Sequence, residues 1–374
     1  MRRVAQVAFS GLSGASDVCA ALAIAGQKAG VQQTLAFWGT EPVIEARVKR
    51  CADTGIETAS FPKKRGIDSA GQRAVQDWAA ANRDADAFIL HYPAALFAVR
   101  KALRGMGKRP PIIAIEHHPN SLKRPHEWLL SVLLLWRGDG VVYLTDVYRN
   151  DVARKLGPLF SFRKKRTAVI SNGIELDRYQ TPGLAKTPGE LVIGMSGRMT
   201  PVKDYATLLR AFAALRKNQP GLRARLEFAG DGPMRAELEA LAASLGIAGS
   251  VTFLGLMPFN DLLPRMRSWD TFVLSTHGET QPLALMEAMA CGLPCIGSAV
   301  AGVTDVVRDG QNGILVPESD PAALAGALGQ LATDTTRRAQ LAEAALYCAQ
   351  TSFSSAKMWE NFQTFIATLS SAAR

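Results

Sequence analysis

Residues 277–297 read HGETQPLALMEAMACGLPCIG and hold two glutamates, Glu279 and Glu287, eight positions apart. In one continuous helix this spacing would separate the two residues by ~12 Å along the axis. Pro282 suits the first turn of a helix, so we expect Glu279 in the preceding loop and Glu287 on the helix itself. The positive end of the helix would then lie between the carboxylates, open to a phosphate group. Taken alone, the two glutamates are better explained by a solvated loop residue and a capping or ion-pair residue.

On both sides of this segment, apolar runs rich in β-branched residues alternate with helix-period segments, which is typical of βα units and parallel sheets. The predicted strands are 4–9, 33–38, 87–90, 112–116, 140–144 and 168–170, then 191–195, 226–229, 251–254, 271–274, 294–296 and 314–316. The polar stretch 178–190 (RYQTPGLAKTPGE) is the best linker. A length of 374 residues also favours two domains. We therefore expect two doubly wound α/β domains with a cleft between the carboxyl ends of their sheets.

The turns after the first two predicted strands argue against a dinucleotide cofactor. The first turn reads SGLSG, with Gly11 and Gly14, and does not match G-x-G-x-x-G. After the second strand, Trp38 and Gly39 stand where an acidic residue would hold a ribose hydroxyl. Two Rossmann-like domains without these features are not those of a nicotinamide-dependent dehydrogenase.

Cysteine usage and hydropathy favour a reducing, cytoplasmic location. The five cysteines show neither a C-x2-C pair nor zinc-finger spacing with histidine. The first residues, MRRVAQVAFSG, are better explained by a strand and turn than by a signal peptide. The most membrane-like run, residues 128–136 (WLLSVLLLW), has nine residues, whereas a spanning helix needs ~20. We expect a chain that does not cross a bilayer.

The net positive charge of the chain comes entirely from its first half. Residues 1–180 hold 27 Lys and Arg against 16 Asp and Glu, whereas residues 181–374 hold 16 against 17, so the first half carries the whole excess of the +10 net charge. A solvated loop face explains any one of the basic runs at 63–65, 108–109 and 163–166. Together they favour an anionic partner.

Residues 279–294 (ETQPLALMEAMACGLP) resemble the E-x7-E signature of retaining glycosyltransferases with the GT-B fold, specifically family four, the glycosyl transferases group 1. Further segments match that family in the right order: Asn172-Gly173-Ile174, Gly197-Arg198 with Lys203-Asp204, Gly230-Asp231-Gly232-Pro233, Phe253-Leu254-Gly255 and the run 301–305 (AGVTD). The resemblance implies two Rossmann-like, doubly wound parallel-sheet domains facing a central cleft. The acceptor-binding domain would be 1–180, the donor-binding domain 181–353, and a last helix near 354–374 would pack back on the first domain.

The resemblance also assigns the donor site. Arg198 and Lys203 match the cations that meet the charge developing on the departing diphosphate, a role that requires fixed positive groups. Glu287 would hold the nucleotide ribose and Glu279 would contact the donor sugar. The remaining donor-site positions are Gly230 and the backbone amides of Leu283 and Ala284. Each cation is otherwise explained as a surface residue near a helix start, a position that the helix dipole disfavours without an anion.

Two departures from the family pattern concern this site. The family often has Phe-Gly where this chain has Gln281-Pro282. Pro282 has no backbone N–H, so one possible contact with phosphate is missing. Gln281 in place of an aromatic residue leaves the identity of the donor sugar open. Asp305 stands where Glu is more usual, and no role is assigned to it.

In the first half, Ile115-Glu116-His117-His118 ends a predicted strand and resembles the family's strand-end histidine. His117 is the candidate for contacting donor sugar and acceptor, with His118 as its competitor; a histidine that only hydrogen-bonds a loop explains the pattern nearly as well. The small residues around Gly11 and Gly14 would let backbone approach the diphosphate or the acceptor. An ordinary βα turn explains them equally.

The resemblance implies a front-face substitution with retention, since no carboxylate nucleophile is evident in the sequence. Neither a metal nor a cofactor is expected: the one D-x-D string, Asp84-Ala85-Asp86, is better explained by a solvated helix end. The expected activity is transfer of a hexose from a UDP- or GDP-sugar to a glycan or lipid-linked acceptor in bacterial cell-envelope polysaccharide, lipopolysaccharide or glycolipid synthesis. The basic first half would then contact an anionic membrane surface as a peripheral protein.

Three alternatives stay open. Within the fold, the chain could be a sugar-nucleotide epimerase or a transferase with a soluble acceptor. A nucleic-acid-binding protein is supported by the charge alone, because no aromatic-basic interleaving or recognition motif accompanies it.

Overall fold

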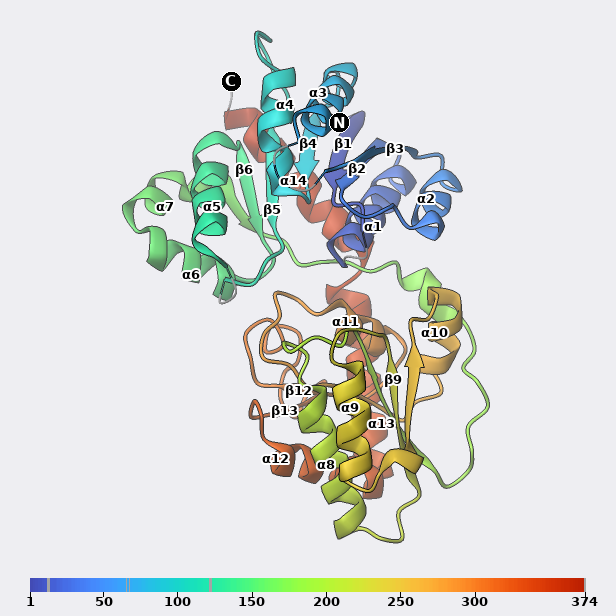
Figure 1. Ribbon diagram of the computed structural model, residues 1–374. Helices are drawn as coiled ribbons and strands as arrows, with labels where there is room; N and C mark the ends of the chain where they lie inside the picture. Colours follow the sequence, from blue (N-terminus) through green and yellow to red (C-terminus); the bar gives the residue numbers. More distant parts are fainter. Residues whose placement is uncertain (12–13, 65, 67, 121–122, 373–374) are drawn as a thin grey trace. The chain divides into compact units, whose positions relative to one another are not determined.

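The computed structural model describes residues 1–11, 14–64, 66, 68–120 and 123–372 (Figure 1). The middle of the predicted glycine turn, Leu12 and Ser13, and Arg65 of the first basic run lie outside the described residues. The chain divides into two compact units: unit 1 comprises Met1–Glu175 and Ser354–Arg374, and unit 2 comprises Leu176–Phe353.

Unit 1 is built on a seven-stranded parallel sheet of order β3-β2-β1-β4-β5-β6-β7. Its strands are β1 (Arg3–Ala8), β2 (Gln32–Gly39), β3 (Glu57–Pro62), β4 (Ala87–Leu90), β5 (Ile112–Glu116), β6 (Gly140–Tyr143) and β7 (Thr167–Val169). Its helices are α1 (Gly14–Lys28), α2 (Glu45–Ala52), α3 (Ser69–Ala81), η1 (Pro93–Ala95), α4 (Leu96–Ala102), α5 (Pro125–Arg137), α6 (Asp146–Leu156), α7 (Pro158–Arg163), η3 (Lys164–Arg166) and α14 (Ser355–Ala372).

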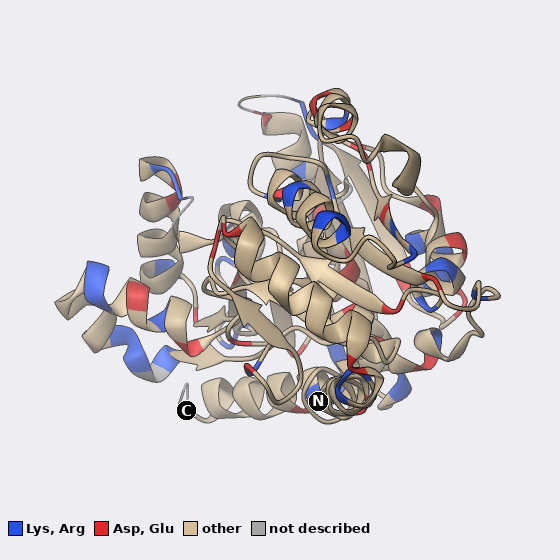
Figure 2. Cartoon of the chain, turned by 90° about the horizontal axis from the view of Figure 1, so that it is seen from below, with Lys and Arg blue, Asp and Glu red and all other residues tan. Residues whose placement is uncertain are grey.

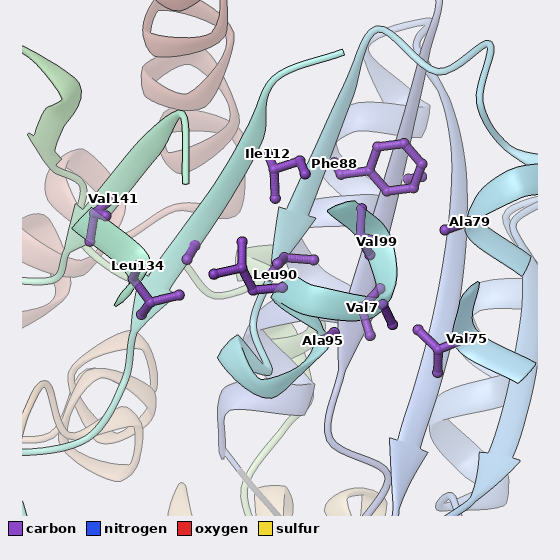
Figure 3. Close-up of a cluster of buried hydrophobic side chains, with 14 of the residues drawn as sticks. Val7, Val75, Ala79, Phe88, Leu90, Ala95, Val99, Ile112, Leu134 and Val141 are labelled. Carbon is purple, nitrogen blue, oxygen red and sulfur yellow. The ribbon is translucent and has the colours of Figure 1, made fainter. Parts of the chain in front are cut away.

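Helices cover both faces of this sheet because the strands bury side chains on both faces. On β2, Ala36 and Trp38 join a cluster with α3, α4 and α5, part of which is drawn in Figure 3. The intervening residues Leu35 and Phe37 join a second cluster with α1 and α2. This period of two places successive side chains on opposite faces.

The C-terminal helix α14 returns to unit 1, against which its aromatic residues are buried. The N–H of Ser355 donates to the carbonyl of Ile174 at 2.8 Å. A Cβ on Gly173 would lie 2.7 Å from the Ser354 carbonyl oxygen, so only glycine allows this approach. The Asn172-Gly173-Ile174 segment therefore contacts the start of α14, where the chain returns to unit 1.

Unit 2 is built on a six-stranded parallel sheet of order β10-β9-β8-β11-β12-β13. Its strands are β8 (Leu191–Ser196), β9 (Ala224–Ala229), β10 (Val251–Gly255), β11 (Thr271–Leu274), β12 (Cys295–Ser298) and β13 (Ile314–Val316). Its helices are η4 (Leu176–Gln180), α8 (Tyr205–Asn218), α9 (Arg235–Ser244), η5 (Ala248–Ser250), α10 (Phe259–Met266), α11 (Leu283–Ala290), α12 (Pro321–Thr333) and α13 (Thr335–Ser352).

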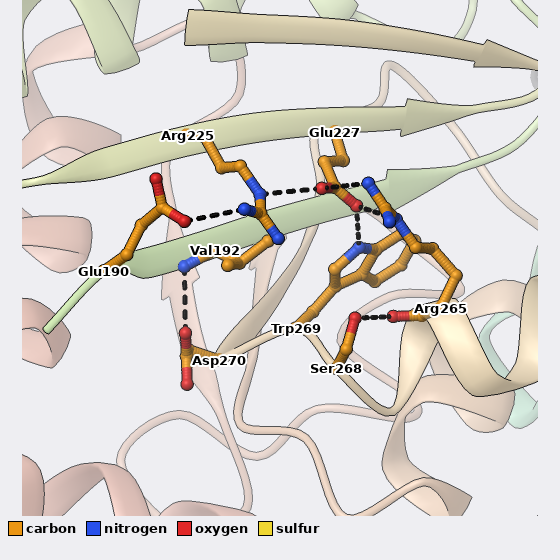
Figure 4. A network of polar contacts seen from close by, with 8 residues as sticks. All are labelled: Glu190, Val192, Arg225, Glu227, Arg265, Ser268, Trp269 and Asp270. Carbon is orange, nitrogen blue, oxygen red and sulfur yellow. Dashed lines mark hydrogen bonds and ion pairs between the residues drawn. The ribbon is translucent and has the colours of Figure 1, made fainter. Parts of the chain in front are cut away.

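A buried carboxylate fastens α10 to this sheet (Figure 4). Glu227 on β9 is fully buried and accepts hydrogen bonds from Arg225 Nε at 2.8 Å, Arg265 Nε at 2.7 Å and Trp269 Nε1 at 2.8 Å. The Trp269 ring lies where a Cβ on Gly194 would be, 1.9 Å from its Cδ2 atom. Because each of these donors satisfies the buried charge, the network fixes the segment between α10 and β11.

The unit boundary and one strand differ from the sequence prediction. The boundary falls after Glu175 rather than after residue 180, because η4 is held within unit 2 by α11. The edge strand β3, sequence ETASFP, was not predicted, and none of its residues is fully buried. A short edge strand of this kind carries little apolar signal.

Candidate functional site

In unit 2, the loops after β8 and β11 lie side by side at the point where the strand order reverses. Ligands of doubly wound sheets bind at this switch point, beyond the carboxyl ends of the strands. The two loops are joined by backbone: His277 N donates to Val202 O at 2.8 Å, and Asp204 N donates to Ser275 O at 3.1 Å. The edge therefore presents Lys203 and Glu279 from two segments fixed to each other.

Lys203 and Glu279 form an ion pair across these loops. The Lys203 side chain is 18% exposed and the Glu279 side chain 14% exposed, so the pair is largely shielded from water. Removing either partner would leave a charge in a poorly solvated place. The structure thus brings together two of the predicted site residues, 76 positions apart in the chain.

Arg198 lies in the loop after β8 and is exposed. Among the residues that the structure describes, its side chain has no hydrogen bond or ion pair. The backbone of this loop, by contrast, is held by hydrogen bonds. Thr200 N donates to Arg198 O at 2.9 Å, and Met199 N donates to Asp231 O at 2.9 Å. A rigid loop that carries an available guanidinium fits the binding of an anion.

The turn 230–232 packs directly on this loop. Gly230 has a φ of +135°, and a Cβ there would lie 2.0 Å from the Gly197 carbonyl oxygen. A Cβ on Gly232 would lie 2.4 Å from the Met199 carbonyl oxygen. Gly230 therefore acts by close packing that sets the position of the Arg198 loop.

The helix α11 exposes one face at the same edge. Leu283, Ala284 and Glu287 are partly exposed, whereas the other residues of the helix are buried. Pro282 lies immediately before the helix with φ −76° and ψ 107°, not in its first turn as expected. The first N–H groups of a helix have no intrahelical acceptor, so the amides of Leu283 and Ala284 suit an anion.

Glu287 is positioned by a tyrosine that the sequence analysis placed in the linker. The hydroxyl of Tyr179 donates to Glu287 Oε1 at 3.1 Å, and Arg267 Nη1 donates to the Tyr179 carbonyl oxygen at 2.7 Å. Burial raises the pKa of Tyr179 well above its usual value, so the hydroxyl keeps its proton and remains a donor. No pattern in the sequence indicated this pair.

The turn at 300–305 supports the loop that carries Glu279. Gly302 has a φ of +83°, and a Cβ there would lie 2.2 Å from the Glu279 carbonyl oxygen. Asp305, which had no assigned role, accepts the N–H of Gly302 at 3.3 Å. The turn therefore packs under the Glu279 backbone.

Replacing Gly302 with alanine is expected to destabilise unit 2 and weaken the site. The left-handed backbone alone costs alanine ~1–2 kcal/mol, and the contact with Glu279 O adds to this. Thermal unfolding measures the effect. Gly326→Ala is the matched control, because Gly326 lies within α12 with nothing within 4 Å of a Cβ. Equal stabilities of the two variants would contradict the role of Gly302.

In unit 1, the corresponding switch point lies between β1 and β4 and is occupied by two histidines. His91 follows β4 and is buried, and its Nδ1 lies 3.2 Å from His117 Nε2. The two rings are nearly parallel, with centroids 5.3 Å apart. His91 was missed by the sequence analysis, although it follows a predicted strand as His117 does.

Unit 1 is expected to lose stability as the pH falls from 6.5 towards 5. Burial lowers the pKa of His117 to about 4 and that of His91 well below its usual value. In this window the unfolded chain binds protons on both histidines and the folded chain does not, so acid favours unfolding, by up to ~1.4 kcal/mol per pH unit for each histidine. Urea unfolding at pH 7.5 and 5.0 measures this loss; a constant midpoint would contradict it.

The other predicted unit 1 residues lie in more ordinary settings. The His118 side chain is 49% exposed, and its Nε2 lies 3.8 Å from Glu127 Oε1. A Cβ on Gly11 would lie 2.1 Å from Glu41 Oε2, so a carboxylate side chain fills the space beside this turn. Gly14 begins α1. The contact of this turn with the diphosphate or the acceptor therefore stays a prediction.

Comparisons with known proteins assign the family. The model described as Glycosyl transferases group 1 matches residues 180–346, and the model described as Glycosyltransferase Family 4 matches residues 12–178. Together the two models span most of the chain. The chain therefore belongs to the group 1 glycosyltransferases.

A D-inositol 3-phosphate glycosyltransferase of Stackebrandtia nassauensis is 40% identical over 218 residues, which cover 54% of this chain and 46% of that protein. The chain thus matches about half the length of this curated relative. Two solved structures resemble the whole chain: Anabaena Alr3699/HepE in complex with UDP and glucose (TM-score 0.80, 19% identity, 98% and 100% covered) and sucrose-phosphate synthase from Thermosynechococcus elongatus (TM-score 0.77, 17% identity, 100% of each covered). These structures show that the fold is GT-B.

Proposed function

We propose that this protein is a retaining glycosyltransferase that uses a nucleotide-sugar donor and binds the donor's diphosphate at the carboxyl edge of the unit 2 sheet. One observation carries the proposal: Arg198, Lys203 and the amino end of α11 all lie at this edge, on loops fixed to each other. Two cations and free helix amides are the groups that a leaving diphosphate requires. Glu287 lies one turn along the same helix face, where it would accept hydrogen bonds from the ribose hydroxyls.

The proposed reaction forms a bond between the acceptor oxygen and the anomeric carbon on the face from which the diphosphate leaves. The bond between the anomeric carbon and the phosphate oxygen breaks, and the acceptor proton passes to that phosphate oxygen. Arg198 and Lys203 would stabilise the negative charge that collects on the diphosphate. Glu279 would hold the Lys203 ammonium in place and contact the donor sugar. No step in this scheme requires a metal or a cofactor.

For the acceptor we propose a phosphate-bearing molecule bound by unit 1. The excess positive charge of residues 1–180 supports this choice. A lipid-linked or lipopolysaccharide acceptor at the cell envelope is one source of such phosphate. The names of the curated relatives, D-inositol 3-phosphate glycosyltransferases, favour a soluble phosphorylated acceptor as the second candidate.

A surface on α5, α7 and η3, defined by Leu129, Trp136, Phe162, Lys164 and Arg166, fits an anionic membrane. Leu129 and Trp136 are each 59% exposed and lie seven residues apart, on one face of α5. Phe162 on α7 is 82% exposed. Arg163 Nη2 donates to Trp136 O at 3.3 Å, which joins α7 to α5. Lys and Arg gather on the helices at the left of Figure 2, where Figure 1 places α6 and α7. No helix among the described residues is long and apolar enough to span a bilayer.

We expect the protein to float with vesicles that contain phosphatidylglycerol at low salt, and not with neutral vesicles. Lys164→Ala with Arg166→Ala should weaken this binding about tenfold or more, since each cation near an anionic surface contributes ~1 kcal/mol. Phe162→Ala should weaken it further. Tyr347→Ala, which removes an exposed aromatic of unit 2, is the matched control. A wild-type protein that ignores anionic vesicles would exclude a membrane-bound acceptor and leave the soluble one.

The proposed activity is tested by screening UDP- and GDP-sugars for thermal stabilisation of the protein and then analysing the product formed from the best donor. We expect release of the nucleoside diphosphate and a product whose anomeric configuration equals that of the donor. A product of opposite configuration would contradict retention. Conversion of the donor sugar without an acceptor would instead support an epimerase.

A further inference from the structure

The side chain of His277, in the loop after β11, reaches two other loops at the carboxyl edge of the unit 2 sheet. Its Nδ1 lies 2.7 Å from Glu318 Oε1, in the segment between β13 and α12. Its Nε2 lies 3.9 Å from Asp204 Oδ2, in the segment between β8 and α8. The imidazole ring therefore connects three loops, although the motif around Glu279 assigns no role to this histidine.

The two carboxylates hold the ring in different ways. An ionised carboxylate only accepts hydrogen bonds, so the Nδ1 of His277 carries the proton and donates it to Glu318. The Asp204 carboxylate is itself fixed, because its Oδ1 accepts the N–H of Thr207 at 3.1 Å at the start of α8. Glu318 thus orients the ring, and the second ring nitrogen faces a carboxylate that cannot move freely.

The backbone beside this ring is tied to the loop that carries Lys203. The N–H of His277 donates to Val202 O at 2.8 Å, and Thr276 Oγ1 donates to the same oxygen at 2.9 Å. Val202 directly precedes Lys203 in the chain. His277 stands two positions before Glu279, the partner of that lysine. A displacement of His277 would therefore shift both members of the ion pair.

Two properties of the contact between His277 and Glu318 indicate a role in the site rather than in the fold. The two side chains are 40% and 45% exposed, and ion pairs as exposed as this contribute little to stability. Ser319, which follows Glu318, has a φ of +57°, the one positive φ of a residue other than glycine in the part of the chain that the structure describes. Such backbone is uncommon for a residue with a Cβ and gathers at active sites and ligand-binding loops.

We propose that His277 is a positioning residue of the donor site, which holds the Lys203–Glu279 pair in place through its contact with Glu318. Its contribution to turnover rests on the proposed glycosyl transfer, whereas its effect on the loops does not. Negative charge collects on the diphosphate as the diphosphate leaves, so the position of Lys203 matters most in the transition state. Loss of the contact between His277 and Glu318 should therefore lower kcat more than it raises KM for the donor.

Hydrogen exchange of the full-length protein without any ligand tests the effect on the loops. In His277→Ala, we expect the backbone N–H groups of residues 202–204 and 275–279 to exchange at least ~tenfold faster than in the wild type, because the loops open more often. His277→Asn keeps an N–H donor near the Nδ1 position and should restore most of the protection. Glu343→Ala, which changes an exposed glutamate on α13, is the matched control. Unchanged exchange in His277→Ala would overturn the proposal.

The kinetics of two single variants and of their combination test the effect on turnover. His277→Ala and Glu318→Ala should each lower kcat about tenfold and change KM for the donor less than about threefold, since a small misplacement of a catalytic group is costly. The double variant should be no slower than either single variant, because both substitutions remove the same contact. Additive losses, or a His277→Ala variant that does not fold, would overturn the proposal. A wild-type protein that turns over no donor would instead refute the proposed function, and the exchange result would still decide whether His277 holds the loops.

Discussion

Replacing Arg198 with alanine is expected to lower kcat by ~10²–10³, the loss seen when one fixed group that stabilises developing charge is removed from an active site. The guanidinium is available for the departing diphosphate because it has no hydrogen bond or ion pair among the described residues. For the same reason its removal should leave the fold intact. Steady-state turnover of the best donor measures the effect, and thermal unfolding verifies the fold.

Arg210→Ala is the matched control for this variant. Arg210 is also exposed and belongs to the same unit, on α8, which begins just after the Lys203 loop. Loss of its charge should change kcat less than twofold. Equal effects of the two substitutions would mean that Arg198 acts only through the general field of the protein, and the assignment of the diphosphate site would fail.

Replacing Glu287 with alanine is expected to raise the Kd for a nucleoside diphosphate at least ~10²-fold. A carboxylate that accepts hydrogen bonds from two ribose hydroxyls makes two charge-assisted hydrogen bonds, each worth about 1.5–3 kcal/mol. Glu287 lies on the partly exposed face of α11 and is oriented by the Tyr179 hydroxyl at 3.1 Å. Isothermal titration with UDP and GDP measures the change.

Two further variants divide this effect between charge and orientation. Glu287→Gln keeps the acceptor for Tyr179 but loses the negative charge, so it should weaken binding less than the alanine variant does. Tyr179→Phe keeps the charge and removes one orienting hydrogen bond, worth about 0.5–1.5 kcal/mol, so its effect should stay near tenfold or below. Glu287→Ala with unchanged nucleotide binding would refute the ribose assignment.

Local patterns in the sequence were sufficient to predict most strands of the two sheets. The strands Ala87–Leu90, Ile112–Glu116, Thr271–Leu274 and Ile314–Val316 have the predicted bounds, because each is a continuous apolar run that ends at a polar or turn residue. The edge strand β3 was missed because its residues are only partly buried or exposed. Apolar periodicity reports burial, and an edge strand has little of it.

The side-chain contacts of the site depend on the order of the strands, so they were harder to predict from the sequence. The motif residues around Arg198 and Glu287 could be placed on a loop and on a helix, since Gly and Pro mark the loops. The Lys203–Glu279 ion pair joins residues from the loops after β8 and β11, and only the strand order makes these loops neighbours. Tyr179 could not be found at all, because a tyrosine in a polar segment has no pattern that points to a carboxylate 108 positions away.

The measurement that tests the central claim most directly is calorimetric titration of the full-length protein with a nucleoside diphosphate and with the corresponding nucleoside, for both uridine and guanosine. If Arg198, Lys203 and the amides of Leu283 and Ala284 hold the diphosphate, one nucleoside diphosphate should bind at least ~10²-fold more tightly than its nucleoside, since charge-assisted hydrogen bonds to phosphate are strong. Arg198→Ala should shrink that difference. Equal affinities for nucleoside and diphosphate, or no binding of either diphosphate, would contradict the account.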